Sequence, residues 1–446
     1  MSRSVKNSKK IIFKGKIDKL VYGGFGITDC NGLKVFVPYA ALSDELELVL
    51  TEEKKHYGVA KINKIITPSP LRIEPQCPYF TKCGGCDWQH ITYEGQLTIK
   101  KDIVKEILMR HGQINWHGTF SIIPSIPFRY RNKSQFPLSE APPKIGYYAR
   151  KTHDVVDIEI CLLHLPVFDQ ILKKIKKSIF KSQEPIYNEK EHSGNLRHVI
   201  LRGGINTNEI LIIFVTRTHK LSPRIYKELP DEFSNIVGIN QNINPDRTNR
   251  ILGSQTKILY GQEFYYEKIL NWTFRISATS FFQINTYQLA NLINILRSYL
   301  TDATNILDLY CGVGVLSIAI SDKAKRIWGI EINSEAIADA RTNAQLNNVN
   351  NIEFIAQDVK NVISDFKDID TVIIDPPRKG CEKTVLEKIV QLRPTTIIYI
   401  SCNPTTFTRD LVFLSKYHYQ LSNCTLVDMF PQTYHIELIA QIVRNV

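Results

Sequence analysis

The sequence predicts an α/β protein that ends in a doubly wound, Rossmann-like sheet and begins with a small β-barrel, with a strand-rich part between them. Two patterns carry this prediction. From about residue 281, continuous apolar runs alternate with amphipathic helical spacing, as in a parallel sheet covered on both faces. Residues 11–74 instead alternate apolar and polar positions in short runs broken by glycines, which is typical of a small barrel.

Length and composition restrict the class of protein. A chain of 446 residues exceeds what one hydrophobic core usually holds, so two or three domains are expected. Hydrophobic residues make up 43% and charged residues 22%, which excludes a mostly disordered chain. We find neither a signal-peptide pattern nor a run of about 18 apolar residues. The sequence therefore predicts a cytoplasmic protein without a membrane partner, and it indicates no obligate protein partner.

The charge is strongly positive and locally clustered. The formal net charge is +12, and the first twenty residues contain seven Lys or Arg residues against a single Asp. Such an excess favours a polyanionic partner, and nucleic acid is the most common one. Charge alone does not separate RNA from DNA.

Changes in pattern along the chain divide it into parts. A proline-rich linker precedes residue 75, and a segment with helical spacing at about 91–111 follows it. We expect a basic tail at 1–10, a barrel at 11–74, a central domain at 75–280 and a Rossmann-like domain at 281–446, with the helix packed on this last domain.

A glycine loop follows the first strand of the predicted parallel sheet. Gly312 and Gly314 stand where nucleotide-binding sheets turn into their first helix, but the third glycine of the dinucleotide fingerprint is missing. This favours S-adenosylmethionine over NAD. Glu331 at the next strand end is placed to bind ribose hydroxyls, and Asp358 after the third strand can face the adenine.

Two further strand ends carry the groups for catalysis. Asp375 begins a Pro-Pro loop that also suits enzymes that methylate exocyclic amines, but the next strand delivers Cys402 to the same edge. Uracil C5 requires such a thiol, because it becomes nucleophilic only after a thiolate adds at C6. Glu437 in the final strand is the candidate base. The alternatives are a cysteine that only packs and a glutamate that only faces solvent.

Three cysteines form a tight group, Cys77-x5-Cys83-x2-Cys86, and Cys161 is a fourth candidate ligand. Four thiolates can hold zinc or a 4Fe-4S cluster. Three local ligands and one distant one favour iron and sulfur, while zinc stays an alternative. The cysteines without such a grouping are expected to pack in the core: Cys30, Cys311, Cys381 and Cys424.

The motifs DLYCGVG, DPPRKG, SCNP and MFPQTYHIE resemble those of the bacterial class I RNA uracil-5-methyltransferases, in particular the branch that modifies 23S ribosomal RNA. The resemblance implies Cys402 as the nucleophile and Glu437 as the proton acceptor. Val315 departs from the asparagine of some relatives, so no cofactor contact is inferred there. The residues that the resemblance implies in contact with the cofactor are Gln283, Tyr310, Glu331 and Asp375.

The same resemblance implies roles for the other parts. The four grouped cysteines would carry a 4Fe-4S cluster without a redox step, and residues 11–74 resemble the TRAM domain, an OB-like RNA-binding barrel. Phe281 matches an aromatic position that lies against RNA. Arg129, Arg131 and Lys133 alternate, so we expect them on one face of one strand as a phosphate-binding stripe. The barrel candidates for RNA contact are Lys14, Lys16, Lys19, Tyr22 and Phe25.

The leading prediction is an enzyme that makes 5-methyluridine in 23S ribosomal RNA. A second prediction keeps the chemistry and changes the target to the T-loop uridine of transfer RNA. The barrel and the cysteine group argue against it, since the bacterial transfer RNA enzymes of the family look shorter and lack both. A third possibility is an iron-sulfur RNA-binding protein with an inactive methyltransferase fold.

Overall fold

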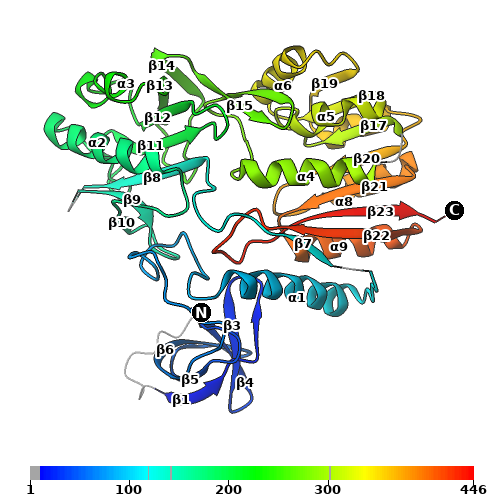
Figure 1. The fold of residues 1–446 in the computed structure, drawn as a ribbon, viewed down its shortest axis with the longest axis horizontal. Coiled ribbons are helices and arrows are strands. Elements are labelled where there is room, and N and C mark those ends of the chain that lie inside the picture. Colours follow the sequence, from blue (N-terminus) through cyan, green and yellow to red (C-terminus); the bar gives the residue numbers. More distant parts are fainter. Residues whose placement is uncertain (1–10, 119, 141–142, 301–302, 446) are drawn as a thin grey trace.

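The computed structural model describes residues 11–118, 120–140, 143–300 and 303–445, so the predicted basic tail at 1–10 lies outside the described residues. Figure 1 shows a blue barrel at the bottom, a cyan and green sheet on the left and a larger sheet on the right that ends in red. The long helix α1 (Tyr93–Gly112) lies between the barrel and the larger sheet. Its N-cap is Thr92, whose side chain accepts a hydrogen bond from the Gly95 amide at 3.3 Å.

The N-terminal part is a six-stranded sheet in the order β1-β5-β6-β4-β3-β2, and the predicted all-β module is confirmed. Alternate side chains of its strands are buried, among them Val35, Val37, Leu46 and Leu48. Gly15 is required by close packing, because a Cβ there would come within 2.6 Å of the Thr28 hydroxyl oxygen. The strands are β1 (Ile12–Lys16), β2 (Lys19–Val21), β3 (Phe25–Cys30), β4 (Leu33–Pro38), β5 (Glu45–Glu53) and β6 (Gly58–Thr67).

The central part is a seven-stranded sheet in the order β10-β9-β8-β11-β12-β13-β14, followed by the hairpin of β15 and β16. Among the described strands of this sheet, β12 and β13 pair in parallel and the other neighbours are antiparallel. The strands are β8 (Lys133–Ser139), β9 (Lys144–Tyr148), β10 (Val155–Asp157), β11 (Leu196–Gly203), β12 (Ile210–Thr216), β13 (Ile236–Ile243), β14 (Gln255–Gly261), β15 (Phe264–Ile269) and β16 (Trp272–Ser277).

A helix of 17 residues, α2 (Pro166–Ser182), also belongs to this part, although the sequence was interpreted as strand-rich and turn-rich. Pro166 suits the first turn of a helix, and buried apolar residues at three- and four-residue spacing form its inner face. These residues are Phe168, Ile171, Leu172, Ile175 and Ile179. A short helix, α3 (Leu229–Glu232), and a 3-10 turn, η1 (Pro223–Ile225), complete the central part.

The predicted stripe of basic residues on one strand is wrong. Strand β8 begins only at Lys133, and Arg129 lies before it with a φ of 58°, where its guanidinium contacts Asp169 at 3.2 Å. Arg131 has a buried Nε atom without a hydrogen-bond partner. Burial and the nearby Arg202 lower the pKa of Lys133 to about 7. The three side chains are half-buried and do not belong to one strand, and their contact with RNA stays a prediction.

The C-terminal sheet has the order β19-β18-β17-β20-β21-β23-β22-β7. The first five strands are parallel, and β23 runs antiparallel to β21. The predicted doubly wound sheet is confirmed. Its strands are β17 (Ala303–Leu309), β18 (Ala324–Glu331), β19 (Ile352–Ala356), β20 (Thr371–Ile374), β21 (Thr396–Ser401), β22 (Tyr419–Val427), β23 (Glu437–Arg444) and β7 (Ser121–Ile123).

Helices cover both faces of this sheet (Figure 1). They are α4 (Thr286–Tyr299), α5 (Val315–Ala319), α6 (Ser334–Leu346), α7 (Val359–Val362), α8 (Lys383–Leu392) and α9 (Pro404–Ser415), with 3-10 turns η2 (Ser321–Lys323) and η3 (Ile363–Asp365). Helix α1 packs on α9, and β7 pairs with β22, so segments that precede the central sheet in the chain join this part. One continuous core includes Leu48 of the barrel, Ile103 of α1 and Ile397 of β21. The barrel and the C-terminal sheet therefore pack as neighbours with a shared apolar interior.

No helix among the described residues is long and apolar enough to cross a membrane. The cytoplasmic location expected from the sequence stays a prediction.

Candidate active site

The carboxyl ends of the parallel strands meet at one edge of the sheet, where ligands of such folds bind. The loop after β17 makes a tight turn there: Tyr310, Gly312 and Gly314 all have positive φ, at 66°, 54° and 81°. A side chain at Gly314 would bring its Cβ within 2.8 Å of the Phe354 ring, so glycine is required by packing as well as by φ. At Gly312 a Cβ would meet nothing within 4 Å, which leaves the backbone open to a ligand.

Five of the residues predicted from the sequence lie together in the wall of one cavity at this loop: Phe281, Gln283, Tyr310, Gly312 and Asp375. Val315, for which no contact was inferred, lines the same cavity. Three predicted residues do not line it: Gly314, which forms the turn behind it, and the two acids Glu331 and Asp358. The Glu331 carboxylate accepts a hydrogen bond from the Asn333 amide at 2.9 Å, and Asp358 caps α7 by accepting from the Lys360 amide at 3.1 Å. Both stand at strand ends of the same edge, beside the cavity.

Asp308, which the sequence analysis did not single out, lies buried at the end of β17. One of its oxygens accepts a hydrogen bond from the Ser317 hydroxyl, and the other has no partner. Burial raises the pKa of Asp308 to about 7, and burial together with Asp308 raises the pKa of Asp375 to about 7. Through Ser317 the Asp308 carboxyl links β17 to α5, the two elements that the glycine loop joins.

Cys402 and Glu437 face each other across two antiparallel strands. Ser401, the last residue of β21, pairs with Leu438 of β23, so one step further along the ladder Cys402 stands opposite Glu437. Glu437 is only 4% exposed. Asp375 follows β20, the strand next to β21, and therefore lies at the same edge. The three residues therefore lie next to one another, as predicted, because they adjoin the ends of neighbouring strands.

The ionisable groups at this edge of the sheet influence each other's protonation. Burial and the carboxyl of Glu437 raise the pKa of Cys402 to about 11, while the Arg378 guanidinium opposes the shift. Burial and Asp375 raise the pKa of Glu437 well above its usual value. A thiol of high pKa is a strong nucleophile once it is deprotonated, and a buried carboxylate of raised pKa is a stronger base than one in water. The pocket can therefore support addition of a thiolate and removal of a proton.

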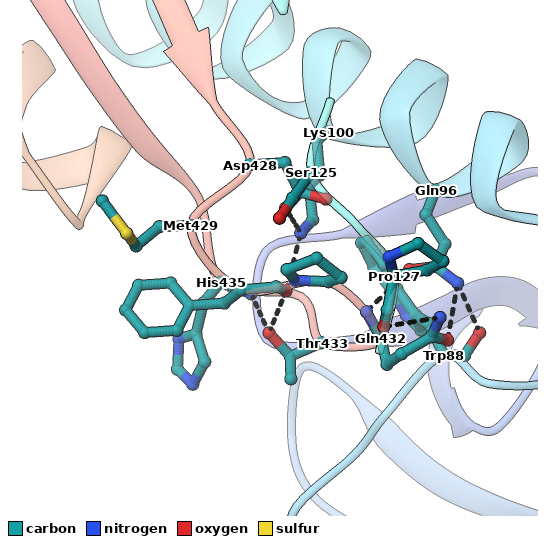
Figure 2. A network of polar contacts seen from close by, with 12 residues as sticks. Trp88, Gln96, Lys100, Ser125, Pro127, Asp428, Met429, Gln432, Thr433 and His435 are labelled. Atoms are coloured by element: carbon teal, nitrogen blue, oxygen red, sulfur yellow. Dashed lines mark hydrogen bonds and ion pairs between the residues drawn. The ribbon is translucent and has the colours of Figure 1, made fainter. Parts of the chain in front are cut away.

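A buried polar network holds the loop that leads into Glu437 (Figure 2). The Lys100 ammonium pairs with Asp428 at 2.6 Å. The Gln96 side chain donates to the Gln432 side-chain oxygen at 3.0 Å and accepts from the Gln432 amide at 2.9 Å. The Trp88 amide donates to the Gln432 carbonyl at 3.0 Å. Residues from α1 and the segment before it therefore fix a loop that comes more than 300 positions later in the chain.

The four predicted ligand cysteines, here called the cysteine quartet, line a single cavity of about 50 Å³: Cys77, Cys83, Cys86 and Cys161. The Gln89 amide group donates to the Cys86 sulfur at 3.1 Å, and the Gly85 amide donates to the Cys83 sulfur at 3.4 Å. Arg131 lines the same cavity. Burial raises the pKa of Cys86, while the hydrogen bond from Gln89 and the Arg131 charge oppose the shift. Within the described ranges no set of three His, Cys, Asp or Glu side chains is arranged to hold a metal ion.

The predicted RNA-binding residues are spread over different environments. Phe281 is 68% exposed at the rim of the cofactor cavity. Lys19 pairs with Glu106 of α1, and Phe25 stacks under Arg150 with 4.8 Å between guanidinium and ring centre, so both contact other parts of the protein. Tyr22 reaches the active site: its hydroxyl donates to the Cys402 carbonyl at 3.1 Å.

Comparisons with known proteins agree with this geometry. The family described as tRNA (uracil-5-)-methyltransferase matches residues 249–444, and the TRAM domain of tRNA (uracil(54)-C(5))-methyltransferase matches residues 13–71. A protein of Clostridium tetani described as an uncharacterized RNA methyltransferase is 39% identical over 426 residues, which cover 93% of each chain. A Bacillus cereus protein with the same description is 37% identical and covers 96% of this chain and 95% of its own length.

The solved structures include a close structural match. The Pyrococcus abyssi tRNA (uracil-54, C5)-methyltransferase in complex with S-adenosyl-L-homocysteine superposes with a TM-score of 0.79 at 29% identity. The match covers 97% of this chain and 100% of the other.

Fold, site and relatives define an S-adenosylmethionine-dependent methyltransferase that acts on RNA. More specifically, the chain belongs to the RNA uracil-5-methyltransferase family and carries that family's TRAM domain.

Proposed function

We propose that the protein methylates C5 of a uridine through a covalent adduct with Cys402. The thiolate of Cys402 adds to C6 of the ring, and the electron pair of the C5=C6 bond moves into an enolate that makes C5 nucleophilic. S-adenosylmethionine supplies the methyl group that C5 then takes up. Glu437 accepts the C5 proton, the C5=C6 bond forms again, and the thiolate of Cys402 leaves with the electron pair of the C–S bond.

The single observation that carries this proposal is the position of Cys402 opposite Glu437 at the edge where Asp375 also lies. Cys402 directly follows β21 and Glu437 begins the neighbouring strand β23, so one pyrimidine ring can contact both groups. Gln283, Tyr310 and Asp375 line the cavity next to them and would hold the cofactor. Glu331 and Asp358 stand at the strand ends beside that cavity and would bind its ribose and adenine.

The test is a methylation assay with S-adenosylmethionine labelled in its methyl group and RNA from a strain that lacks the gene. The proposal expects label in 5-methyluridine after digestion of the RNA. RNA without label at uracil C5, from protein that binds S-adenosylmethionine, would contradict it and favour an inactive methyltransferase fold.

We propose a uridine of 23S ribosomal RNA as the target, on the resemblance of the catalytic motifs. A second candidate is the T-loop uridine of transfer RNA. The barrel no longer argues against this target, because a tRNA (uracil-54, C5)-methyltransferase matches nearly the whole chain and the matched TRAM domain bears a similar description. The cysteine group remains as the argument against it. Mapping 5-methyluridine in ribosomal and transfer RNA of the deletion strain separates the two, since only the true target loses its methyl group.

We further propose that the cysteine quartet holds a 4Fe-4S cluster. Four thiols share one cavity, and an amide group and a backbone N–H already point at two of the sulfurs, which is how proteins support clusters. A zinc ion would hold its four sulfurs only about 3.8 Å apart, given a Zn–S distance of 2.3 Å. A cluster lets the thiolates stand further apart, because each binds a different iron atom. The cluster would fix the loop of three cysteines to Cys161 and take no part in methyl transfer.

Elemental analysis decides this point without an activity assay. Protein purified without oxygen should contain about four iron atoms and sulfide per chain and absorb visible light, and the Cys161→Ser variant should lose both. Stoichiometric zinc in colourless protein would contradict the cluster.

A further inference from the structure

Tyr22 connects the barrel to the active site. It follows β2 and begins the turn formed by Gly23 and Gly24. Its hydroxyl donates a hydrogen bond to the Cys402 carbonyl at 3.1 Å. The edge of its ring meets Tyr434, which lies three positions before Glu437, with 5.6 Å between the ring centres. A side chain of the RNA-binding module thus contacts both chain segments that carry the proposed catalytic groups.

Other segments hold this turn in place. Arg150 donates to the Gly23 carbonyl at 3.1 Å and pairs with Asp87 at 3.4 Å. Gly24 has a φ of 83°, and a Cβ there would lie 3.1 Å from the Tyr434 ring and 3.3 Å from Asp87. The central part and the catalytic loop therefore enclose the turn from two sides.

The surroundings of the Tyr22 hydroxyl keep it protonated. Burial raises the pKa of Tyr22 to about 12, and the nearby groups of Cys402 and Tyr434 add to this shift, while Arg378 opposes it. The hydroxyl is therefore a permanent donor at neutral pH, and the Cys402 carbonyl is the acceptor that it meets.

We propose that Tyr22 is a positioning residue of the methyl transfer: its hydroxyl holds the backbone at Cys402 so that the thiolate can attack C6. This inference rests on the proposed role of Cys402. Addition to C6 requires the sulfur to approach from above the plane of the ring, so a small rotation of the backbone at Cys402 moves it out of line. The barrel then has two tasks, to bind RNA and to complete the catalytic pocket.

The test measures adduct formation separately from RNA binding. RNA with 5-fluorouridine at the target position traps the methylated adduct, because fluorine cannot leave C5 as a cation. The variant Tyr22→Phe keeps the ring and removes only the hydroxyl. We expect its adduct to form about five to ten times more slowly at saturating RNA, with the RNA Kd changed less than twofold.

Tyr57→Phe is the matched control. Tyr57 also belongs to the barrel, and its hydroxyl accepts a hydrogen bond from Lys54 at 3.0 Å, away from the active site. This variant should form the adduct at the wild-type rate. Thermal melting of both variants, within a few degrees of wild type, excludes a folding defect as the cause.

Several outcomes would overturn the inference. One is a Tyr22→Phe variant that forms the adduct as fast as wild type. Another is a variant that binds RNA more weakly but forms the adduct at the wild-type rate once RNA is saturating. A wild-type protein that forms no adduct at all would instead count against the proposed role of Cys402, so the two failures can be told apart.

Discussion

The protein contains two thiol sites that differ in their surroundings. Cys402 stands alone at a strand end, where burial and then Glu437 raise its pKa and the exposed Arg378 opposes them. The cysteine quartet shares one cavity, where N–H groups already donate to two sulfurs and Arg131 lies among the thiols. The cysteines of both sites are half-buried, so burial alone does not distinguish them.

The neighbouring charges do distinguish them. A cysteine that adds to the substrate and leaves it in every cycle must alternate between thiol and thiolate. Carboxyl groups beside it raise its pKa and keep the free thiol neutral until a substrate arrives. Metal ligands instead hold their negative charge permanently and need donors that stabilise it. Carboxyl groups beside the thiol therefore mark the proposed nucleophile, whereas N–H donors and a cation beside the thiols mark the proposed metal ligands.

The largest effect is expected from Cys402→Ala. Without the thiol no adduct forms and uracil C5 stays unreactive, so methylation should fall by at least about a thousandfold. Iron content and melting temperature should stay those of the wild type, because the cysteine quartet is intact. Labelled S-adenosylmethionine measures methyl transfer, and trapping on 5-fluorouridine RNA measures adduct formation.

Cys30→Ala provides the control for this variant, since Cys30 lies on β3 of the barrel, outside both thiol sites. It should methylate normally. A Cys402→Ala variant with substantial turnover would remove the proposed nucleophile while leaving the family assignment intact.

Glu437→Gln should show the next largest effect, because the amide cannot accept the C5 proton. Addition and methyl uptake still occur once, so a covalent protein–RNA adduct should accumulate while turnover falls by about a hundredfold or more. Denaturing gels with unmodified RNA detect the adduct directly. Methylation at the wild-type rate without any accumulated adduct would point to another base. Asp375, whose carboxyl influences Glu437, would be the next residue to examine.

A smaller effect on activity is expected from Cys161→Ser. This change breaks the quartet but leaves every group around Cys402 in place. The melting temperature should fall by several degrees with loss of iron, whereas the adduct on 5-fluorouridine RNA should still form within about tenfold of the wild-type rate. Complete loss of adduct formation in folded protein would mean that the two thiol sites are coupled, against the distinction drawn above.

The sequence alone was enough to predict those site residues whose position depends only on where a strand begins or ends. Gly312, Asp375, Cys402 and Glu437 each stand at the end or beginning of a strand of the same sheet, and a doubly wound sheet brings such positions to one edge. The grouping of Cys77, Cys83 and Cys86 was visible in their spacing, whereas Cys161 lies 75 positions after Cys86 and was only a candidate until the fold placed it in the same cavity.

Features that depend on packing between distant segments were missed. The contact of Tyr22 with Cys402 joins residues 380 positions apart, and nothing local in the barrel indicates it. The alternation of Arg129, Arg131 and Lys133 suggested a strand face, but the positive φ of Arg129 breaks the strand, and tertiary contacts decided that. Asp308 could have been found from its place just before the glycine loop, as a polar residue inside an apolar strand.

The smallest effect tests the charge around Cys402 most directly. Arg378 stabilises the thiolate, so Arg378→Gln should raise the pKa of Cys402 further above about 11 and leave less thiolate at any pH below that value. We expect iodoacetamide to label Cys402 about three times more slowly in the variant at pH 8, since an exposed charge acts through solvent. In both proteins the labelling rate should rise with pH, and the difference should narrow as the pH approaches the pKa.

Lys379→Gln is the matched control for this measurement, because Lys379 carries the neighbouring positive charge but pairs with Glu382 at 3.2 Å. Mass spectrometry of the peptide that contains Cys402 gives the rate for this thiol alone. Equal slowing in both variants would mean that the general positive field of this loop, and not the placement of Arg378, sets the reactivity of Cys402. Faster labelling in Arg378→Gln would contradict the charge argument itself, because removal of a cation can favour a thiolate only if another group moves into its place.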